Sequence, residues 1–138
     1  MIPRRTFLAT TAAAITFLPY AARAAAHAGD SFATDSGEIK VFPVDHASFV
    51  MTTPVGTVYN DPVGDPAMYT DFPAADLILV THEHGDHFNA ETLAAVMGDA
   101  TVLLVNPAVA EKLPEDLKTR ATVLANGEDA LVGKIDVR

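Results

Sequence analysis

Apolar and polar residues alternate after residue 37 in a way that predicts a β-hairpin. Residues 38–42 alternate apolar and polar positions, and residues 47–52 hold a second apolar cluster, so each segment is predicted to be a strand. The segment 53–56 has proline second and glycine fourth, which is typical of a tight turn. Residues 57–59 then return as a strand, so this part of the chain is predicted to be a hairpin.

Beyond the hairpin, the pattern alternates strands and helices. Residues 75–80 and 101–105 are apolar runs bounded by turn residues, which is typical of strands buried on both faces. Asn89 is placed to cap a helix whose apolar face continues to a stop at Gly98. The remaining predicted elements are a loop at 63–73, a short helix at 107–113, a strand at 121–124, and a turn entering a last strand at 131–137. This order predicts an α/β fold: a mixed sheet with helices on one face.

The first 28 residues have the pattern of a twin-arginine export signal. Arg4 and Arg5 precede an apolar stretch and then small residues, and cleavage is expected after Ala28, with Ala24 and Ala26 as alternative sites. An uncleaved membrane anchor is the competing interpretation, but polar residues interrupt the roughly 20 apolar residues that a span needs. We therefore expect a periplasmic protein without stable membrane insertion, consisting of a signal peptide (1–28), a flexible lead-in (29–37) and a partial domain (38–138).

Removal of the signal would make the chain more acidic, because that segment holds Arg4, Arg5 and Arg23 and no acidic residue. The 9 Lys and Arg of the whole chain fall to 6 against 18 Asp and Glu, so the formal net charge changes from −9 to −12. Such a surface repels nucleic acid and anionic lipid, so neither is an expected partner. The chain has no cysteine, which excludes disulfides and thiolate metal ligands.

The histidine run at residues 81–87, Thr-His-Glu-His-Gly-Asp-His, is predicted to bind metal. It directly follows the apolar strand 75–80, and α/β sheets tend to place their sites at the carboxyl ends of such strands. Gly85 would let the backbone bend tightly between ligands. Imidazole and carboxylate groups together suit zinc, and also iron or manganese. A solvated polar loop is the competing interpretation.

Spacing predicts how the side chains of this run are aimed. Alternate residues of an extended segment share one side, so His82, His84 and Asp86 are predicted to converge on one small volume. His87 follows Asp86 directly and is predicted to point toward a second centre nearby. Glu83 should point away from its histidine neighbours, so it is not counted as a ligand.

The run resembles the His-x-His-x-Asp-His motif of the metallo-β-lactamase superfamily. Residues 45–49, the turn at 53–56 and residues 59–62 resemble the opening hairpin of its lactonase-like and N-acyl-phospholipid-hydrolase-like branch. The resemblance covers residues 38–138 and implies the N-terminal half of a four-layer αβ/βα sandwich.

The resemblance also implies two metal ions, usually zinc, that share a bridging hydroxide. His82 and His84 match ligands of the first metal, and Asp86 and His87 match ligands of the second. Asp86 would also orient the water that attacks a carbonyl or phosphorus centre.

Two further residues belong to the expected site. Asp61 matches an acidic residue that lies behind the ligands, although a turn-forming aspartate before proline explains it equally well. His46 is expected to shape the pocket. The family pattern needs more ligands downstream, including two histidines, yet no histidine follows His87. Each metal would therefore have two ligands, whereas catalytic zinc uses three.

Three functions are compatible with these observations. The first is a metal-dependent hydrolase of a small molecule, whether an ester or lactone, an amide or a phosphodiester; the branch resemblance disfavours a β-lactam. The second is a truncated, non-catalytic fragment that binds metal weakly. The third is a metal-binding protein that completes its site by self-association through an exposed sheet face. Whether this chain is itself an active enzyme is left open by the sequence.

Overall fold

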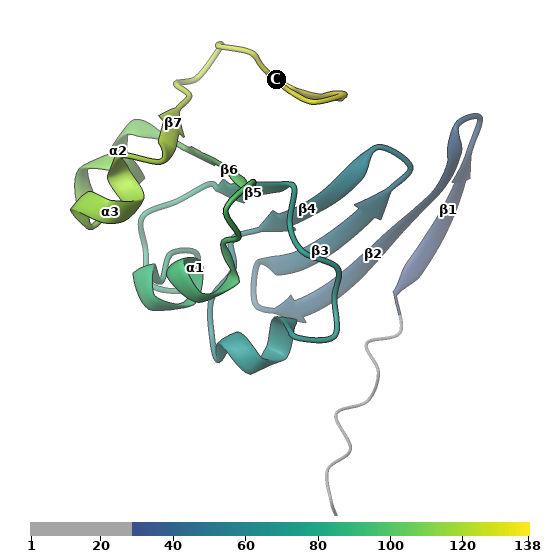
Figure 1. Cartoon of the computed structure of the whole chain (residues 1–138), viewed down its shortest axis with the longest axis horizontal. Helices are drawn as coiled ribbons and strands as arrows, with labels where there is room; N and C mark the ends of the chain where they lie inside the picture. The colour runs from purple at the N-terminus through teal and green to yellow at the C-terminus, as the bar shows by residue number, and fades with distance from the viewer. Residues whose placement is uncertain (1–28) are drawn as a thin grey trace, which may run out of the picture.

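A seven-stranded sheet organises the computed structural model, which describes residues 29–138 (Figure 1). Its strands lie in chain order: β1 (Asp30–Thr34), β2 (Gly37–Asp45), β3 (Ser48–Thr53), β4 (Gly56–Asn60), β5 (Leu77–Val80), β6 (Val102–Val105) and β7 (Ala121–Val123). The first four strands pair antiparallel, and β4 to β7 pair in parallel. The predicted mixed sheet is therefore confirmed, whereas the predicted export signal lies outside the described residues.

Helices cover one face of this sheet and a small hairpin covers the other (Figure 1). The helical elements are η1 (Pro66–Tyr69), α1 (Ala90–Val96), α2 (Pro107–Lys112) and α3 (Glu115–Lys118), and the hairpin is β8 (Ala130–Val132) with β9 (Ile135–Val137). Ile78 of β5 and Leu103 of β6 pack with Leu93 of α1 on the helical face. Leu77 and Leu104 point to the hairpin face, so β5 and β6 are buried on both faces as predicted.

Helix α1 begins where its capping residue predicts. Asn89 Oδ1 accepts hydrogen bonds from the backbone N–H groups of Glu91 and Thr92, both at 3.0 Å. Helix α2 likewise starts after a capping asparagine, Asn106, with Pro107 in its first turn. Helix α3 was not predicted, because a four-residue helix with one buried side chain, Leu117, is too short to show a period. No helix in residues 29–138 has the length and apolarity to cross a bilayer.

Two terminal segments differ from the sequence expectation. Residues 30–34 form strand β1, paired antiparallel with β2, instead of part of a flexible lead-in. All five residues of β1 are exposed, so the strand is held by backbone pairing with β2. Its sequence has no apolar alternation from which a strand could be predicted. At the other end, the expected turn and single strand are a hairpin of two strands, which reverses at Gly133 in the left-handed region (φ 60°).

Candidate metal centre

The histidine run lies in the connection between β5 and α1, at the carboxyl end of a buried strand. The backbone is not extended there. The N–H groups of His87 and Phe88 both donate to the carbonyl oxygen of His84, at 2.9 and 2.8 Å, which closes a turn. The prediction that His82, His84 and Asp86 share one side is therefore wrong, since the turn redirects the chain after His84.

The side chains of the run form two neighbouring groups instead of one. In the first group, His82 Nε2 and His84 Nδ1 lie 2.7 Å apart, with their rings edge to face. The second group brings together Asp86 and His87 with His46, which comes from the turn between β2 and β3. The rings of His82 and His87 are 5.5 Å apart, so the two groups adjoin.

Glu83 lies with the first group, contrary to the expectation that it points away. Its Oε2 is 3.4 Å from His82 Nδ1, the ring nitrogen that does not face His84. Its own backbone N–H lowers the pKa of the Glu83 carboxyl, and the positive charges of His82 and Lys112 lower it further. Lys112, at the end of α2, also donates to the Glu83 carbonyl oxygen at 3.3 Å. The sequence carried no signal for the contact with Lys112, because that contact depends on the packing of α2.

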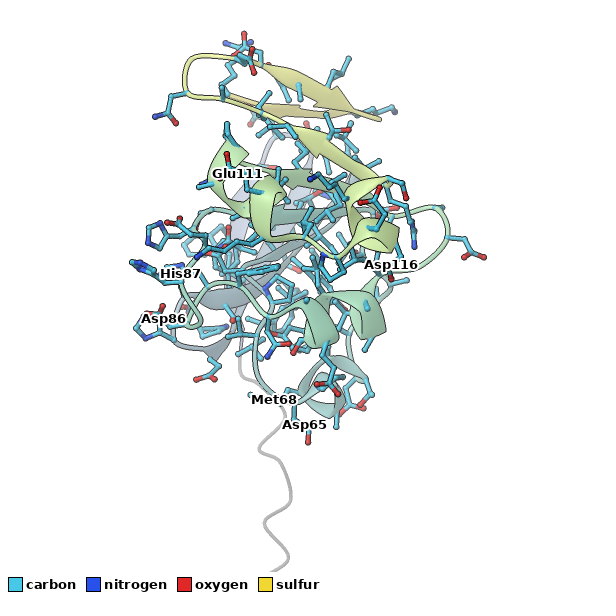
Figure 2. All side chains as sticks on the ribbon, turned by 90° about the vertical axis from the view of Figure 1, so that its left-hand side faces the viewer. Asp65, Met68, Asp86, His87, Glu111 and Asp116 are labelled. Carbon is cyan, nitrogen blue, oxygen red and sulfur yellow. The ribbon has the colours of Figure 1, made fainter. Side chains whose placement is uncertain are left out.

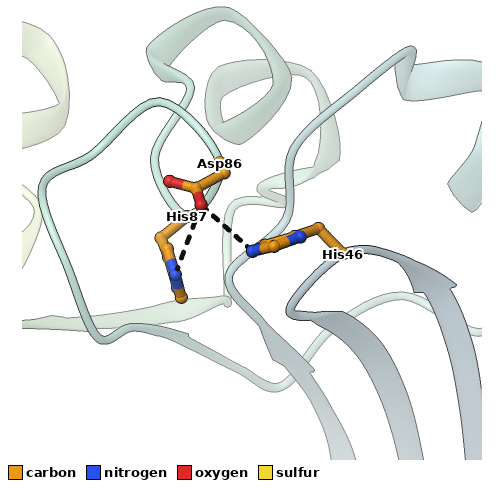
Figure 3. Close-up of side chains that lie close together, drawn as sticks. All are labelled: His46, Asp86 and His87. Carbon is orange, nitrogen blue, oxygen red and sulfur yellow. Dashed lines mark ion pairs between the residues drawn. The ribbon is translucent and has the colours of Figure 1, made fainter.

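Asp86 is the centre of the second group (Figure 3). Its Oδ2 lies 3.0 Å from His46 Nε2 and 3.9 Å from His87 Nε2. The backbone N–H of Asp86 lowers the pKa of its carboxyl, and the nearby His87, His46 and His84 lower it further. Asp86 and His87 project outward at one edge of the molecule (Figure 2). The carboxylate is therefore available as an anionic ligand.

Asp61 is buried behind this group, with 1% of its surface exposed. Its Oδ1 accepts from the Thr81 backbone N–H at 2.7 Å, and its Oδ2 accepts from the Thr81 hydroxyl at 2.6 Å and from Asn60 Nδ2 at 3.1 Å. His87 Nδ1 lies 2.9 Å from the same Oδ2. This hydrogen bond, reinforced by the charges of Asp61 and Asp86, raises the pKa of His87. Asp61 thus lies behind His87 and is hydrogen-bonded to it.

The backbone is strained at two places in the described residues, and both are at this site. His46 (φ 32°) and Asp61 (φ 44°) are the non-glycine residues of residues 29–138 that have positive φ. Such conformations cost free energy and persist where the surroundings impose them, often at functional sites. The chain does bend at Gly85, as expected, but its φ is not positive and an added Cβ would meet nothing within 4 Å, so this bend does not require glycine.

The donors present suit a divalent metal ion. Within each of the two groups, one ligand atom per residue can be chosen so that all lie within 4.8 Å of one another. Neutral imidazole nitrogens and ionised carboxylates are the ligands that zinc, iron and manganese accept. Both groups are partly exposed, which leaves room for water or substrate.

A hollow of about 380 Å³ lies next to the histidine run, on the hairpin side of the sheet. Thr81 and Asn106 line it at the carboxyl ends of β5 and β6, together with Leu79 and Leu104. Asn106 Nδ2 donates to the Thr81 carbonyl oxygen at 2.7 Å, which ties the two strand ends together. Its lining is mostly apolar with a few polar side chains, so it can accept a small molecule beside the site.

Comparisons with known proteins agree with this chemistry. The family described as "Beta-lactamase superfamily domain" matches residues 40–138. A solved structure from Parabacteroides distasonis, described as a "Putative metal-dependent hydrolase", is 37% identical with a TM-score of 0.62. The similarity covers 74% of this chain and 44% of that one, so the chain spans less than half of that protein.

Two curated proteins of Mycobacterium tuberculosis, each named "Putative Rieske 2Fe-2S iron-sulfur protein", are also similar. They are 37% identical over 81 residues, which cover 48% of this chain and 16% of each relative. A Rieske cluster needs cysteine as well as histidine ligands. Because these 138 residues contain no cysteine, they do not themselves supply the ligands of such a cluster.

Proposed function

The chain belongs to the beta-lactamase superfamily, and on that premise we propose that residues 38–138 are part of a metal-dependent hydrolase with a two-metal centre, zinc being the preferred ion. The observation that carries this proposal is the pair of adjoining donor groups after β5. Each group combines imidazole with carboxylate side chains, which are the ligand types of zinc, iron and manganese sites.

We assign His82 and His84 to the first metal, and Asp86 and His87 to the second. His82 Nε2 and His84 Nδ1 lie 2.7 Å apart, so the two ring nitrogens that would hold the first metal are already neighbours. When bound, such ions lower the pKa of a coordinated water toward neutrality and thereby supply a nucleophile for a carbonyl or phosphorus centre. Asp86, whose carboxyl pKa is lowered mainly by its own backbone N–H, is ionised and able to orient that water.

Asp61 holds His87 in one tautomer. An ionised carboxylate can only accept hydrogen bonds, so the proton between the two residues resides on His87 Nδ1. His87 Nε2 then carries the lone pair and faces Asp86. This arrangement supports the role of His87 as a ligand and of Asp61 as the residue that orients it.

The substrate, the location and the extent of the protein are part of the same proposal. We expect a small molecule with an ester or lactone, amide or phosphodiester bond, because the hollow beside Thr81 is small and largely apolar. The lactonase-like branch is favoured by the sequence of the opening hairpin. We also propose export through the twin-arginine pattern of residues 1–28. Hydrolysis by the whole enzyme is expected to need a region equivalent to the part of the Parabacteroides chain that lies outside the match.

Metal analysis of the purified chain tests the proposal. We expect bound zinc, iron or manganese in the native protein and reduced content in the His84→Ala and Asp86→Asn variants. Asp129→Asn is the matched control, because Asp129 is an exposed carboxylate outside the site. Equal metal content in all four proteins would refute the assignment. Assays with lactone, amide and phosphodiester substrates, on a metal-loaded protein that also carries the region proposed to be needed for hydrolysis, would then identify the bond that is cleaved.

A further inference from the structure

We propose that His46 is itself a metal ligand, which together with Asp86 and His87 forms a three-ligand site contained in this chain. This inference rests on the proposed function and deepens it, because the sequence assigned His46 only to the shape of the pocket. With His46 included, the second metal has the three protein ligands that an open zinc site uses. The site then depends on no residue outside those described.

The geometry of the three side chains supports a shared ion (Figure 3). His46 Nε2 and His87 Nε2 lie on either side of Asp86 Oδ2, at 3.0 and 3.9 Å. The three ligand atoms lie within 4.8 Å of one another, and the rings of His46 and His87 are 5.7 Å apart and perpendicular. Two imidazoles and one carboxylate that converge in this way form a set that suits zinc or ferrous iron.

The turn that carries His46 is built to hold it there. Asn60 Nδ2 donates to the Ala47 carbonyl oxygen at 3.2 Å and to Asp61 Oδ2 at 3.1 Å. The Ser48 hydroxyl donates to the Asp61 carbonyl oxygen at 2.5 Å. The residues that follow His46 are thus fastened to Asp61, which also orients His87. Asn60 and Asp61 therefore connect the turn that carries His46 to His87.

The positive φ of His46 belongs to the two-residue turn between β2 and β3, and it sets the direction of the ring. A histidine with a φ of 32° is held in a region that glycine or asparagine occupies more readily. The strained conformation aims the ring at Asp86, whereas 59% of the His46 side chain remains exposed and gains little from burial. The exposed ion pair with Asp86 contributes little stability by itself, so the tight turn sets the conformation of His46.

The test compares metal binding by the full chain, by a His46 variant and by a control variant. Cobalt(II) is titrated against the metal-free protein and followed by its visible absorption, and zinc affinity is measured by competition with a chelator. We expect His46→Asn to weaken one binding event by at least about tenfold and to change its cobalt spectrum. Asparagine removes the imidazole but tolerates the left-handed backbone. Asp129→Asn is the matched control, because it changes an exposed carboxylate outside both groups and should leave this spectrum intact.

Histidine ¹⁵N NMR provides a readout that does not depend on a variant. Zinc addition to the wild-type chain should shift the Nε2 resonance of His46 together with that of His87. The inference is overturned if zinc moves His87 but leaves His46 unchanged, or if His46→Asn binds both metals as the wild type does. In either case the proposed two-metal centre stands. If the wild type binds no metal, the proposed function fails as well.

Discussion

Asp61 Oδ2 lies 2.9 Å from His87 Nδ1, and this contact joins the first parallel strand of the sheet to the candidate metal centre. Asp61 directly follows β4 and His87 lies beyond β5, so the pairing of these two strands brings residues 26 positions apart into contact. Three other donors also bind the Asp61 carboxylate, which fixes its orientation. The position of His87 in the site therefore depends on how β4 and β5 pair in the sheet.

Replacement of Asp61 tests whether it orients His87 for metal binding. Asp61→Asn retains the size of the side chain but can present its amide N–H to His87 Nδ1, which would reverse the tautomer of the ring. We expect metal affinity to fall by about 10- to 100-fold. Chelator competition measures the loss, with Asp129→Asn as control. An unchanged affinity would show that His87 needs no partner to bind metal.

The pH dependence of the metal-free chain should also depend on this contact. The Asp61 hydrogen bond raises the pKa of His87 above 6.5, so the protonated ring is favoured in the folded state. The contribution of this pair to stability is complete below pH 6.5 and is lost as the pH rises through the raised pKa. NMR titration of the His87 ring should give a midpoint above 6.5 that falls in Asp61→Asn. A midpoint that does not move would contradict the assigned cause.

Glu83 and Lys112 offer a finer test of the first donor group. Glu83 Oε2 lies 3.4 Å from His82 Nδ1 and so helps to orient that ring. Glu83→Gln should therefore weaken metal binding by about tenfold, which is less than the loss expected when His82 itself is removed. Lys112→Met removes the donor to the Glu83 carbonyl oxygen and should have a smaller effect in the same direction. The affinities are compared with that of His82→Ala. A Glu83→Gln loss as large as the His82→Ala loss would mean that Glu83 is a ligand.

The burial of Leu93 and the exposure of Leu131 predict different effects on stability when each is replaced by alanine. Leu93 of α1 is fully buried against the sheet, so Leu93→Ala should lower the free energy of unfolding by about 2–5 kcal/mol. Leu131 of β8 is 74% exposed, and Leu131→Ala should change it by less than about 0.5 kcal/mol. Urea denaturation of both variants measures the difference. Equal effects would contradict the packing of α1.

Gly64 and Gly85 differ in whether the fold requires a glycine at that position. Gly64 has a φ of 82°, and a Cβ there would lie 3.2 Å from the Met68 sulfur, so Gly64→Ala should destabilise the fold by about 1 kcal/mol or more. Gly85 lies in the histidine run with no positive φ and open space around it, so Gly85→Ala should fold normally. Thermal unfolding of the two variants distinguishes them. A destabilised Gly85→Ala would indicate that the run needs glycine for another reason.

The sequence determined the order of the elements and the location of the candidate chemistry. Local spacing predicted the hairpin at 38–59, the buried strands β5 and β6, and the helix capped by Asn89, because neighbouring residues alone set these patterns. It also identified the histidine run at the end of a strand. The exposed β1 strand and the short α3 were missed, since neither has an apolar period.

Only the tertiary structure decided how the side chains of the site are grouped. The turn closed on the His84 carbonyl oxygen separates Asp86 from His82, which an extended segment would not do. His46 and Asp61 reach the run because β3 pairs with β4 and β4 with β5, and these pairings depend on the whole sheet. The sequence thus specified which ligand types are present, and the sheet specified which of them meet. The physical reason is that spacing along the chain controls local direction, whereas contacts between distant residues follow from packing.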